Sequence, residues 1–354
     1  MKKKRVLVCV LNWGLGHAAR CVPVIEHLTE SGFEVFIGSD GAALTFLKRE
    51  FAALTFFELP GYNISYPANG NITFSMLLQS PKIISAIKKE NDVVEKIIEE
   101  NEISCMISDN RYGCYSEKIK SVFITHQLNI QAPVGAQFIV NKINSSFLKK
   151  FNEIWVPDVE EENNLSGDLS HKHHFENVYY IGMLSRFNKS SIPEEKNFRY
   201  KFMVLLSGPE PQRSILEKEL LKEAEQISEP VLFVRGLLED KEHLTSSSTN
   251  IRIKNFLKGD ELVEAFAESE IVICRSGYST IMDLAALNKK AVLIPTPGQT
   301  EQEYLADYFQ EKKIFLKNEQ GSLNLKEAAD SISLYSGVFL RNDFTPLKER
   351  ISSL

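Results

Sequence analysis

The chain has 354 residues, of which 43% are hydrophobic and 25% charged, and its formal net charge at pH 7 is −6. This composition is typical of a soluble globular protein, and the acidic balance excludes a nucleic-acid binder that relies on a large basic face. The length exceeds what one hydrophobic core usually organises, so we expect two domains. The five scattered cysteines include no C-x-x-C pair, which favours free thiols in a reducing compartment, the cytoplasm.

The first half of the chain alternates short apolar runs with longer amphipathic segments. The apolar runs are rich in β-branched residues, as in the strands of a buried parallel sheet, and they span residues 5–11, 34–39, 54–59, 104–109, 122–126 and 154–157. Helical spacing of apolar residues predicts helices at residues 17–31 and 81–101. We therefore expect a βαβ series, and no apolar run is long enough to predict a membrane span.

The second half repeats this alternation after an interruption. Around residues 158–175 the apolar periodicity gives way to charged residues, Asn, Gly and Ser, as in a linker. Strands are then predicted at residues 202–206, 231–235, 251–256, 271–274, 291–295 and 314–316, and helices at 213–226, 260–268, 279–287 and 302–311. We predict an α/β protein with two Rossmann-like domains, residues 1–160 and 177–338, a linker at 161–176, and a C-terminal helix within 339–354 that could pack on either domain.

The first candidate site is the stretch GLGHAARC, which follows the first predicted strand. Gly14 and Gly16 leave room for close approach at a helix N-terminus, a corner that attracts anions. The same stretch fits the G-x-G-x-x-[GA] dinucleotide pattern, with Asp40 as a candidate ribose ligand. His17 lies in the first helical turn, where the helix dipole should lower the pKa of its imidazole and make it a usable base. Arg20 is equally compatible with holding an anion and with facing solvent.

A second corner, CRSGYSTIMD, also joins a predicted strand to a helix. Its charge, hydroxyl groups and backbone N–H groups suit a pyrophosphate, and they come from Arg275, Ser276, Gly277, Ser279 and Thr280. Asp283, one turn into the helix, could accept hydrogen bonds from ribose hydroxyls.

Two further corners follow the same strand–loop–helix pattern. In PTPGQTEQE, Gln302 and Glu303 could bind sugar hydroxyls, whose donors and acceptors suit amides and carboxylates. In SGPEPQR, Ser207 and Gly208 are candidate neighbours of a phosphate.

Taken together, GLGH with Pro23 six residues on, and RSGYSTIMD followed by PTPGQTEQE, resemble glycosyltransferase family 28, which includes the UDP-N-acetylglucosamine transferase of peptidoglycan synthesis. The resemblance implies a GT-B fold, in which two Rossmann-like domains face each other across a cleft. It implies a nucleotide-sugar donor, expected to be UDP-linked, on the C-terminal domain and a glycan acceptor, lipid-linked or otherwise, on the N-terminal domain. It also implies a hexosyltransferase of cell-envelope glycan type that inverts the anomeric centre and needs neither a metal nor another cofactor.

The resemblance also implies roles for individual residues. Arg275, Ser276, Gly277 and Thr280 would line the diphosphate, Asp283 the ribose, and Gln302 and Glu303 the sugar. Family members commonly have Glu where this chain has Asp283, and a Gln pair in place of Gln302-Glu303, so the donor sugar stays open.

The base that deprotonates the acceptor is ranked as His17 first, with Asp109 and His126 behind it. Asp109 and His126 end predicted strands at the same sheet edge, although a structural role in a hydrogen-bonded loop suits both equally well. We expect Arg275 and helix N-termini to stabilise the leaving UDP in place of a metal.

Two alternatives remain at this stage. The pattern G-x-G-H-x-x-R-C, formed with Arg20 and Cys21, is similar to that of nucleotide-sugar hydrolases of the nonulosonate pathways, so a hydrolase or epimerase that releases UDP is the second reading. A dinucleotide-dependent oxidoreductase is the third, and it leaves the RSGYST corner without a role.

Two stretches suggest peripheral contact with the inner face of a membrane. One is the aromatic-rich segment at residues 61–78, which would suit an amphipathic acceptor. The other is FLKKF at residues 147–151, which mixes basic and apolar side chains. Covering of the core is the alternative role for each.

Overall fold

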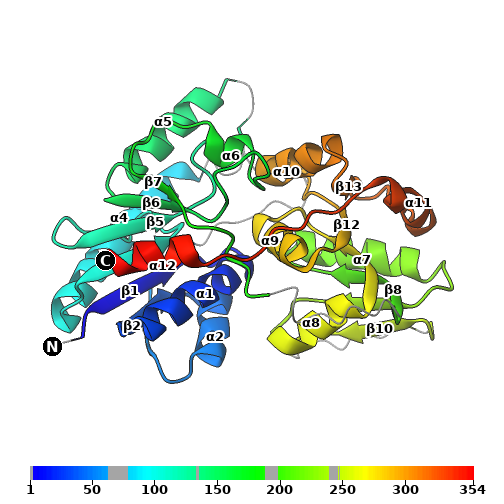
Figure 1. The fold of residues 1–354 in the computed structure, drawn as a ribbon, viewed down its shortest axis with the longest axis horizontal. Coiled ribbons are helices and arrows are strands. Elements are labelled where there is room, and N and C mark those ends of the chain that lie inside the picture. Colours follow the sequence, from blue (N-terminus) through cyan, green and yellow to red (C-terminus); the bar gives the residue numbers. More distant parts are fainter. Residues whose placement is uncertain (1–2, 63–78, 133–134, 188–197, 239–245, 247) are drawn as a thin grey trace. The chain divides into compact units, whose positions relative to one another are not determined.

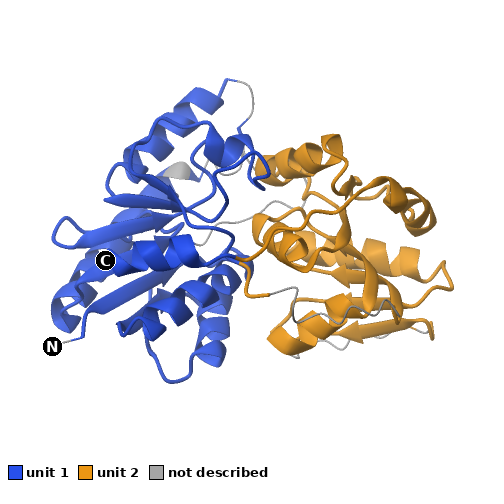
Figure 2. Cartoon of the chain, viewed as in Figure 1, with its two compact units in different colours: residues 1–65, 73–184, 343–354 blue, residues 66–72, 185–342 orange. Residues whose placement is uncertain are grey.

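Two parallel sheets organise the chain, each within its own compact unit (Figures 1 and 2). The computed structural model describes residues 3–62, 79–132, 135–187, 198–238, 246 and 248–354. Unit 1 comprises residues 1–65, 73–184 and 343–354, and unit 2 comprises residues 66–72 and 185–342.

The sheet of unit 1 has seven strands in the order β3-β2-β1-β4-β5-β6-β7. Its strands are β1 (Arg5–Val10), β2 (Glu34–Ser39), β3 (Thr55–Glu58), β4 (Cys105–Asp109), β5 (Lys120–Ile124), β6 (Glu153–Val156) and β7 (Val178–Tyr180). Its helices are α1 (Gly16–Glu30), α2 (Gly41–Glu50), α4 (Ser80–Asn101), α5 (Gln137–Leu148), α6 (Asp168–His171) and α12 (Thr345–Ser352).

All strand pairs of this sheet are parallel, so their carboxyl ends lie at one edge. Strand β1 lies between β2 and β4, and the register pairs Val10 with Asp109. The chain therefore winds outward from β1 to β3 and then returns to β4. The carboxyl ends of β1 and β4 form the topological switch point, which is where open parallel sheets bind ligands.

Apolar side chains from α4 cover one face of this sheet. Val94 and Ile98 pack in one buried cluster with Leu7 of β1 and Met106 of β4. The β-branched strands and the helical spacing of α4 thus meet as the sequence patterns predict.

The sheet of unit 2 has six strands in the order β10-β9-β8-β11-β12-β13, again all parallel. Its strands are β8 (Tyr200–Leu205), β9 (Val231–Val234), β10 (Ile251–Lys254), β11 (Ser269–Cys274), β12 (Lys290–Leu293) and β13 (Leu316–Lys317). Its helices are α7 (Gln212–Ala224), α8 (Gly259–Ala267), α9 (Tyr278–Leu287), α10 (Thr300–Glu311), α11 (Leu325–Ser331) and the 3₁₀ helix η2 (Ile332–Leu334). The register pairs Leu205 with Cys274, so the switch point lies between β8 and β11.

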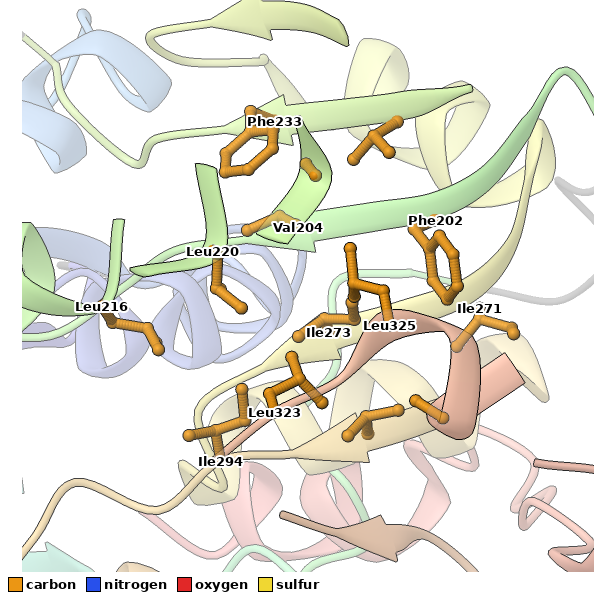
Figure 3. Packing of buried hydrophobic residues seen from close by; sticks show 14 of the residues in the cluster. Phe202, Val204, Leu216, Leu220, Phe233, Ile271, Ile273, Ile294, Leu323 and Leu325 are labelled. Carbon is orange, nitrogen blue, oxygen red and sulfur yellow. The ribbon is translucent and has the colours of Figure 1, made fainter. Parts of the chain in front are cut away.

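Figure 3 shows the core that holds this second sheet together. Phe202 and Val204 of β8 and Ile273 of β11 lie among Leu216 and Leu220 of α7, all with at most 1% of the side chain exposed. The fold class predicted from the sequence, two Rossmann-like units with parallel sheets, is confirmed.

The structure differs from the linker predicted at residues 161–176. This stretch contains α6, and Leu165 and Leu169 are fully buried. The carboxylate of Asp158, also fully buried, accepts hydrogen bonds from the backbone N–H groups of Leu165 and Ser166. The polar residues of the stretch therefore fix a folded loop, and the chain leaves unit 1 only after Leu184.

The segment predicted as a C-terminal helix, residues 339–354, is divided between the two units. Residues up to Asn342 belong to unit 2, whereas α12 packs against α1 in unit 1. Leu347 and Ile351 of α12 are fully buried there, and the ring of Phe344 contacts that of His27 with 4.9 Å between centroids. Among the helices that the structure describes, none has the length and apolar character required to span a bilayer.

Candidate active site

Three side chains of α1 converge on Asp109 at the carboxyl end of β4. His17 Nδ1 lies 2.7 Å from Asp109 Oδ1, and Arg20 donates from Nε to Oδ2 at 2.6 Å and from a terminal nitrogen to Oδ1 at 2.5 Å. The thiol of Cys21 donates to Oδ2 at 3.2 Å. The carboxylate thus accepts four hydrogen bonds at the switch point of the first sheet.

The local sequence explains this convergence. Gly14, with a φ of 76°, turns the chain after β1, and α1 begins at Gly16. Residues at positions i, i+3 and i+4 share one face of a helix, so the spacing of His17, Arg20 and Cys21 directs all three toward β4. The pattern G-x-G-H-x-x-R-C is therefore a set of partners for Asp109.

The charges at this site are nearly all withdrawn from water. Asp109 is fully buried and Arg20 is 1% exposed, whereas the His17 side chain keeps 15% exposure. Burial alone would raise the pKa of Asp109, but Arg20 and then His17 outweigh it and hold that pKa well below its usual range. Burial, followed by the negative charge of Asp109, disfavours the thiolate and raises the pKa of the Cys21 thiol. The thiol therefore stays protonated.

His17 is held neutral near pH 7. Burial, and then the positive charge of Arg20, lower the pKa of its imidazole from the ordinary value of 6.5. The ionised Asp109 can only accept hydrogen bonds, so His17 donates from Nδ1 and the lone pair of the neutral ring lies on Nε2. This is the tautomer that a general base requires.

His126, the third candidate base, belongs to the same buried network. It is 3% exposed, and its Nδ1 lies 3.3 Å from a terminal nitrogen of Arg20. Because a guanidinium only donates, Nδ1 of His126 is the acceptor in this contact. His126 thus helps to position Arg20. The sequence had left Arg20 as either an anion ligand or a solvent-facing residue, whereas in the structure it is buried and bonded to Asp109.

The carboxylate of Asp40 is engaged within the protein and is not free to bind the ribose of a dinucleotide. It accepts from Arg111 at 2.6 Å and from the side-chain amide of Asn12 at 3.1 Å. Arg111 in turn binds the buried Glu90 at 2.5 Å. This network joins the ends of β1, β2 and β4, which argues against the oxidoreductase reading of GLGHAA.

The second predicted corner lies at the switch point of unit 2, where β11 leads into α9. Gly277 is the N-cap of α9, and no side chain caps the first turn. Gly277, Ser279 and Thr280 are partly exposed. A methyl group added at Gly277 would meet no atom within 4 Å. A helix N-terminus without a side-chain cap and the open space at Gly277 together make this turn suitable for an anion.

The structure buries Arg275, for which sequence reasoning had expected direct contact with the diphosphate. Arg275 is 1% exposed, and its terminal nitrogens donate to the carbonyls of Ile294, Pro295 and Gln212 and to Gln320 Oε1. Burial lowers the pKa of Arg275 to about 10, so the group stays protonated at pH 7. In the part of the chain that the structure describes, Arg275 forms no close ion pair, although the negative charge of Glu219 acts on it and opposes the effect of burial on its pKa.

Other predicted donor residues also bind within the protein. Ser276 is fully buried and donates to the carbonyl of Gln302 at 2.7 Å. Gln302 Oε1 accepts from the N–H of Thr296 at 2.8 Å, and Glu303 Oε1 accepts from the N–H of Gly298 at 2.7 Å. Gln302 and Glu303 therefore shape the loop between β12 and α10, a structural role that sequence reasoning missed.

Asp283 also differs from its expected role toward a ribose. Its Oδ1 accepts from the hydroxyl of Ser185 at 2.6 Å. Burial raises the pKa of Asp283 to about 6, against the opposing effects of Ser185 and Arg186. The Asp283 side chain thus anchors the segment at which the chain enters unit 2.

Ser207 and Gly208 lie in the loop between β8 and α7, and both are partly exposed. Gly208 has a φ of 99°, a conformation that favours glycine. Since β8 and β11 are neighbours, this loop and the first turn of α9 leave adjacent strand ends at the same sheet edge.

Family comparisons agree with this architecture. The model for "Glycosyltransferase family 28 C-terminal domain" matches residues 213–334, and that for "Glycosyl transferase family 1" matches residues 4–153. An uncharacterized glycosyltransferase of Methanosarcina acetivorans is 24% identical over 346 residues, covering 87% of this chain and 84% of its own length. The UDP-N-acetylglucosamine–N-acetylmuramyl-(pentapeptide) pyrophosphoryl-undecaprenol N-acetylglucosamine transferase of Histophilus somni is 39% identical over 72 residues, 20% of this chain and 19% of its own.

Solved structures show the same fold. CalG4, the calicheamicin glycosyltransferase, has a TM-score of 0.65 at 11% identity and covers 100% of this chain and 93% of its own. MurG of Acinetobacter baumannii has a TM-score of 0.57 at 12% identity, covering 99% and 100%. The two sheets and these matches define a glycosyltransferase with the GT-B fold. Within that class, the match to the C-terminal domain of glycosyltransferase family 28 covers residues 213–334, which lie in unit 2.

Proposed function

We propose that the protein transfers a hexose from a UDP-sugar to a hydroxyl group of a glycan acceptor, lipid-linked or otherwise. The main support for this proposal is the 2.7 Å contact between His17 Nδ1 and Asp109 Oδ1. This contact leaves Nε2 of the neutral imidazole free to accept a proton. The transferase names in the comparisons and the anion-suited turn at Gly277 support this assignment.

The proposed step is a single displacement. His17 Nε2 takes the proton of the acceptor hydroxyl, the acceptor oxygen bonds to the anomeric carbon, and the bond from that carbon to the UDP oxygen breaks. Attack opposite to the leaving group inverts the anomeric centre. Asp109 stabilises the imidazolium that forms, because it is ionised and bonded to Nδ1.

The leaving UDP gains negative charge and requires a positive environment. We propose that the N-terminal turn of α9 binds the diphosphate through backbone N–H groups, with the buried charge of Arg275 contributing to the positive environment. This arrangement would need no metal. Chelator treatment should therefore leave the transfer rate unchanged, and a rate restored only by added Mg²⁺ would contradict metal independence.

The test of the assignment is UDP release by purified protein given UDP-sugars. Release that depends on an added sugar acceptor supports transfer, and NMR of the product's anomeric proton reports inversion. Rapid stoichiometric release of UDP and free sugar without an acceptor would instead establish the hydrolase, which the His17, Arg20 and Cys21 pattern also fits. We place the reaction in the cytoplasm, because all five cysteines are free and buried.

A further inference from the structure

The loop between β1 and α1 carries a large aromatic side chain close in sequence to the candidate base. Trp13 is 36% exposed, although tryptophan is highly buried on average in folded proteins. It lies four residues before His17, at the carboxyl edge of the first sheet. A partly exposed tryptophan at the edge where parallel sheets bind ligands is a candidate contact for a substrate.

Both ends of this loop are bonded to Asp109. The N–H of Leu11 donates to the carbonyl of Asp109 at 3.2 Å, and His17 Nδ1 lies 2.7 Å from its carboxylate. Because one residue of extended chain spans at most about 3.6 Å, the Cα atoms of Trp13 and His17 lie within about 14 Å of each other. Gly14, with a φ of 76°, turns the chain between them. An acceptor of one or two linked sugar rings can therefore contact both the indole and the imidazole.

The residue before Trp13 fixes the backbone of the loop. Asn12 donates from its side-chain amide to Asp40 Oδ2 at 3.1 Å, and its Oδ1 accepts from the N–H of Ala43 at 3.2 Å. Asp40 is itself bonded to the buried Arg111. The loop is thus tied to the start of α2, and a ligand that contacts Trp13 would need to order little backbone.

The indole of Trp13 is not committed to the fold. Among the residues that the structure describes, no group accepts a hydrogen bond from its Nε1–H and no aromatic ring packs on it. Trp155 differs, because it is fully buried and donates from Nε1 to Glu153 Oε2 at 2.8 Å. Trp13 therefore offers a ligand both an apolar ring and a donor without a partner.

A pyranose ring matches both properties of this indole. Its faces consist of C–H groups, which gain dispersion energy and lose contact with water when they stack on an apolar ring. Its edge carries hydroxyl groups, which can accept from Nε1–H. A lipid chain would leave the N–H without a partner, and a phosphate would lose hydration against the apolar ring.

The two stretches predicted to contact an amphipathic acceptor have other features in the structure. In FLKKF, Leu148 and Phe151 are buried and cover the core, the alternative role considered for this stretch. At residues 61–78, Tyr62 is buried and bonded to Glu90, and residues 63–78 lie outside the described residues.

We propose that a pyranose ring of the acceptor stacks on Trp13, with the hydroxyl that receives the sugar directed toward His17 Nε2. This inference rests on the proposed function and deepens it, because it names the part of the acceptor that is recognised and the residue that selects it. The same ring can belong to a free glycan or to one linked to a lipid.

The first test uses the fluorescence of the two tryptophans. Iodide should quench Trp13, which is exposed, but not Trp155, which is fully buried. The probes are the methyl β-D-pyranosides of glucose, galactose, mannose and N-acetylglucosamine, and at saturation at least one should remove most of the quenching. Trp13→Phe should lose the quenchable emission altogether, which assigns that emission to Trp13.

A second set of probes separates a sugar ring from an alkyl chain. Equal protection by the methyl and hexyl glycosides of the same sugar would indicate a free glycan, and tighter protection by the hexyl glycoside would indicate a lipid-linked one. Both results support stacking of the ring. Protection by 1-hexanol without protection by any methyl glycoside would show that Trp13 binds a chain instead, and would overturn the proposal.

The third test measures transfer to the glycoside that protects best. Trp13→Ala should raise the KM for this acceptor about tenfold while kcat and UDP affinity stay within about twofold. Trp13→Phe should recover most of the loss, since it keeps a planar ring. Leu334→Ala is the control, because Leu334 is 73% exposed but lies in unit 2. The temperature of unfolding should be unchanged in all three variants, whereas a merely structural role of Trp13 would lower it.

The proposal is wrong if no glycoside protects Trp13 from iodide, or if Trp13→Ala keeps the wild-type KM for the acceptor. The quenching measurement contains no nucleotide, so it can succeed even if the donor is not a UDP-sugar. UDP release that depends on an acceptor can likewise occur when Trp13 has no part in binding. Failure of this inference is therefore distinguishable from failure of the proposed function.

Discussion

The basicity of His17 depends on buried charges as well as on its place in a helix. The position in the first turn of α1 correctly predicted a lowered pKa, yet the main cause is burial, followed by Arg20. Arg20 also pairs with Asp109, so the residue that lowers the pKa of His17 fixes the carboxylate that orients it. The contribution of Asp109 cannot be predicted from GLGHAARC alone, because Asp109 is 92 residues from His17 in the sequence.

Replacing His17 with Ala should lower kcat by about a hundredfold to ten-thousandfold, the range typical of a lost general base. The affinity for UDP, measured by calorimetry, should stay within about twofold. His27→Gln is the control, since His27 lies in the same helix but pairs with Glu30 near its other end. An unchanged kcat in His17→Ala would remove the imidazole from the mechanism.

The neighbours of His17 should shift the pH profile in opposite directions. Asp109 raises the pKa of His17 and Arg20 lowers it, and activity requires the neutral imidazole, so the rate falls as pH falls through that pKa. Asp109→Asn should therefore move the acidic limb of kcat/KM to lower pH while reducing kcat. Arg20→Gln should move it to higher pH, above the wild-type value. Shifts in the same direction would show that another group titrates.

At the scale of elements, sequence patterns located the strands and the two glycine-containing strand–helix corners well. Both corners lie where βαβ topology predicts them, at the carboxyl ends of β1 and β11. The roles of individual side chains were harder to predict. Arg275 and Gln302 have the residue types of ligand contacts, yet the structure uses them to fix loops whose carbonyl and N–H groups would otherwise lack partners.

The first turn of α9 offers a test that separates binding from folding. Gly277→Ala should leave the free energy of unfolding within about 0.5 kcal/mol, because the residue has an ordinary φ and the added methyl group meets no atom within 4 Å. The same methyl group would obstruct a diphosphate at the backbone, so UDP affinity should fall at least about tenfold. If the variant were normally stable and still bound UDP tightly, the diphosphate would have to bind at a site other than this turn.

At the scale of the whole molecule, two domains were predictable from chain length and repeated βα alternation, but their boundary was not. The polar stretch at residues 161–176 resembles a linker in composition, whereas the hydroxyl group of Ser166 within it donates to the buried carboxylate of Asp158 inside unit 1. Composition does not distinguish polar residues that are solvated from those that are bonded to each other. The return of α12 to unit 1 likewise depends on packing that no local pattern encodes.

Removing residues 343–354 should destabilise unit 1 selectively. The deletion exposes surface covered by the fully buried Leu347 and Ile351, a loss of about 3 kcal/mol or more. Calorimetry should show the transition of unit 1 at lower temperature, while UDP still stabilises a transition assigned to unit 2. An equal loss of stability and of UDP affinity in both units would contradict this division.

The position of α12 also bears on how the protein is made. Ribosomes release the strands of the first sheet early, but the helix that seals α1 emerges only after the whole of residues 185–342. Domains of nascent chains generally fold in order of emergence. In this protein, unit 2 can complete its core while α12 is still being synthesised. Unit 1 can complete its core only after α12 has been made and can pack against α1.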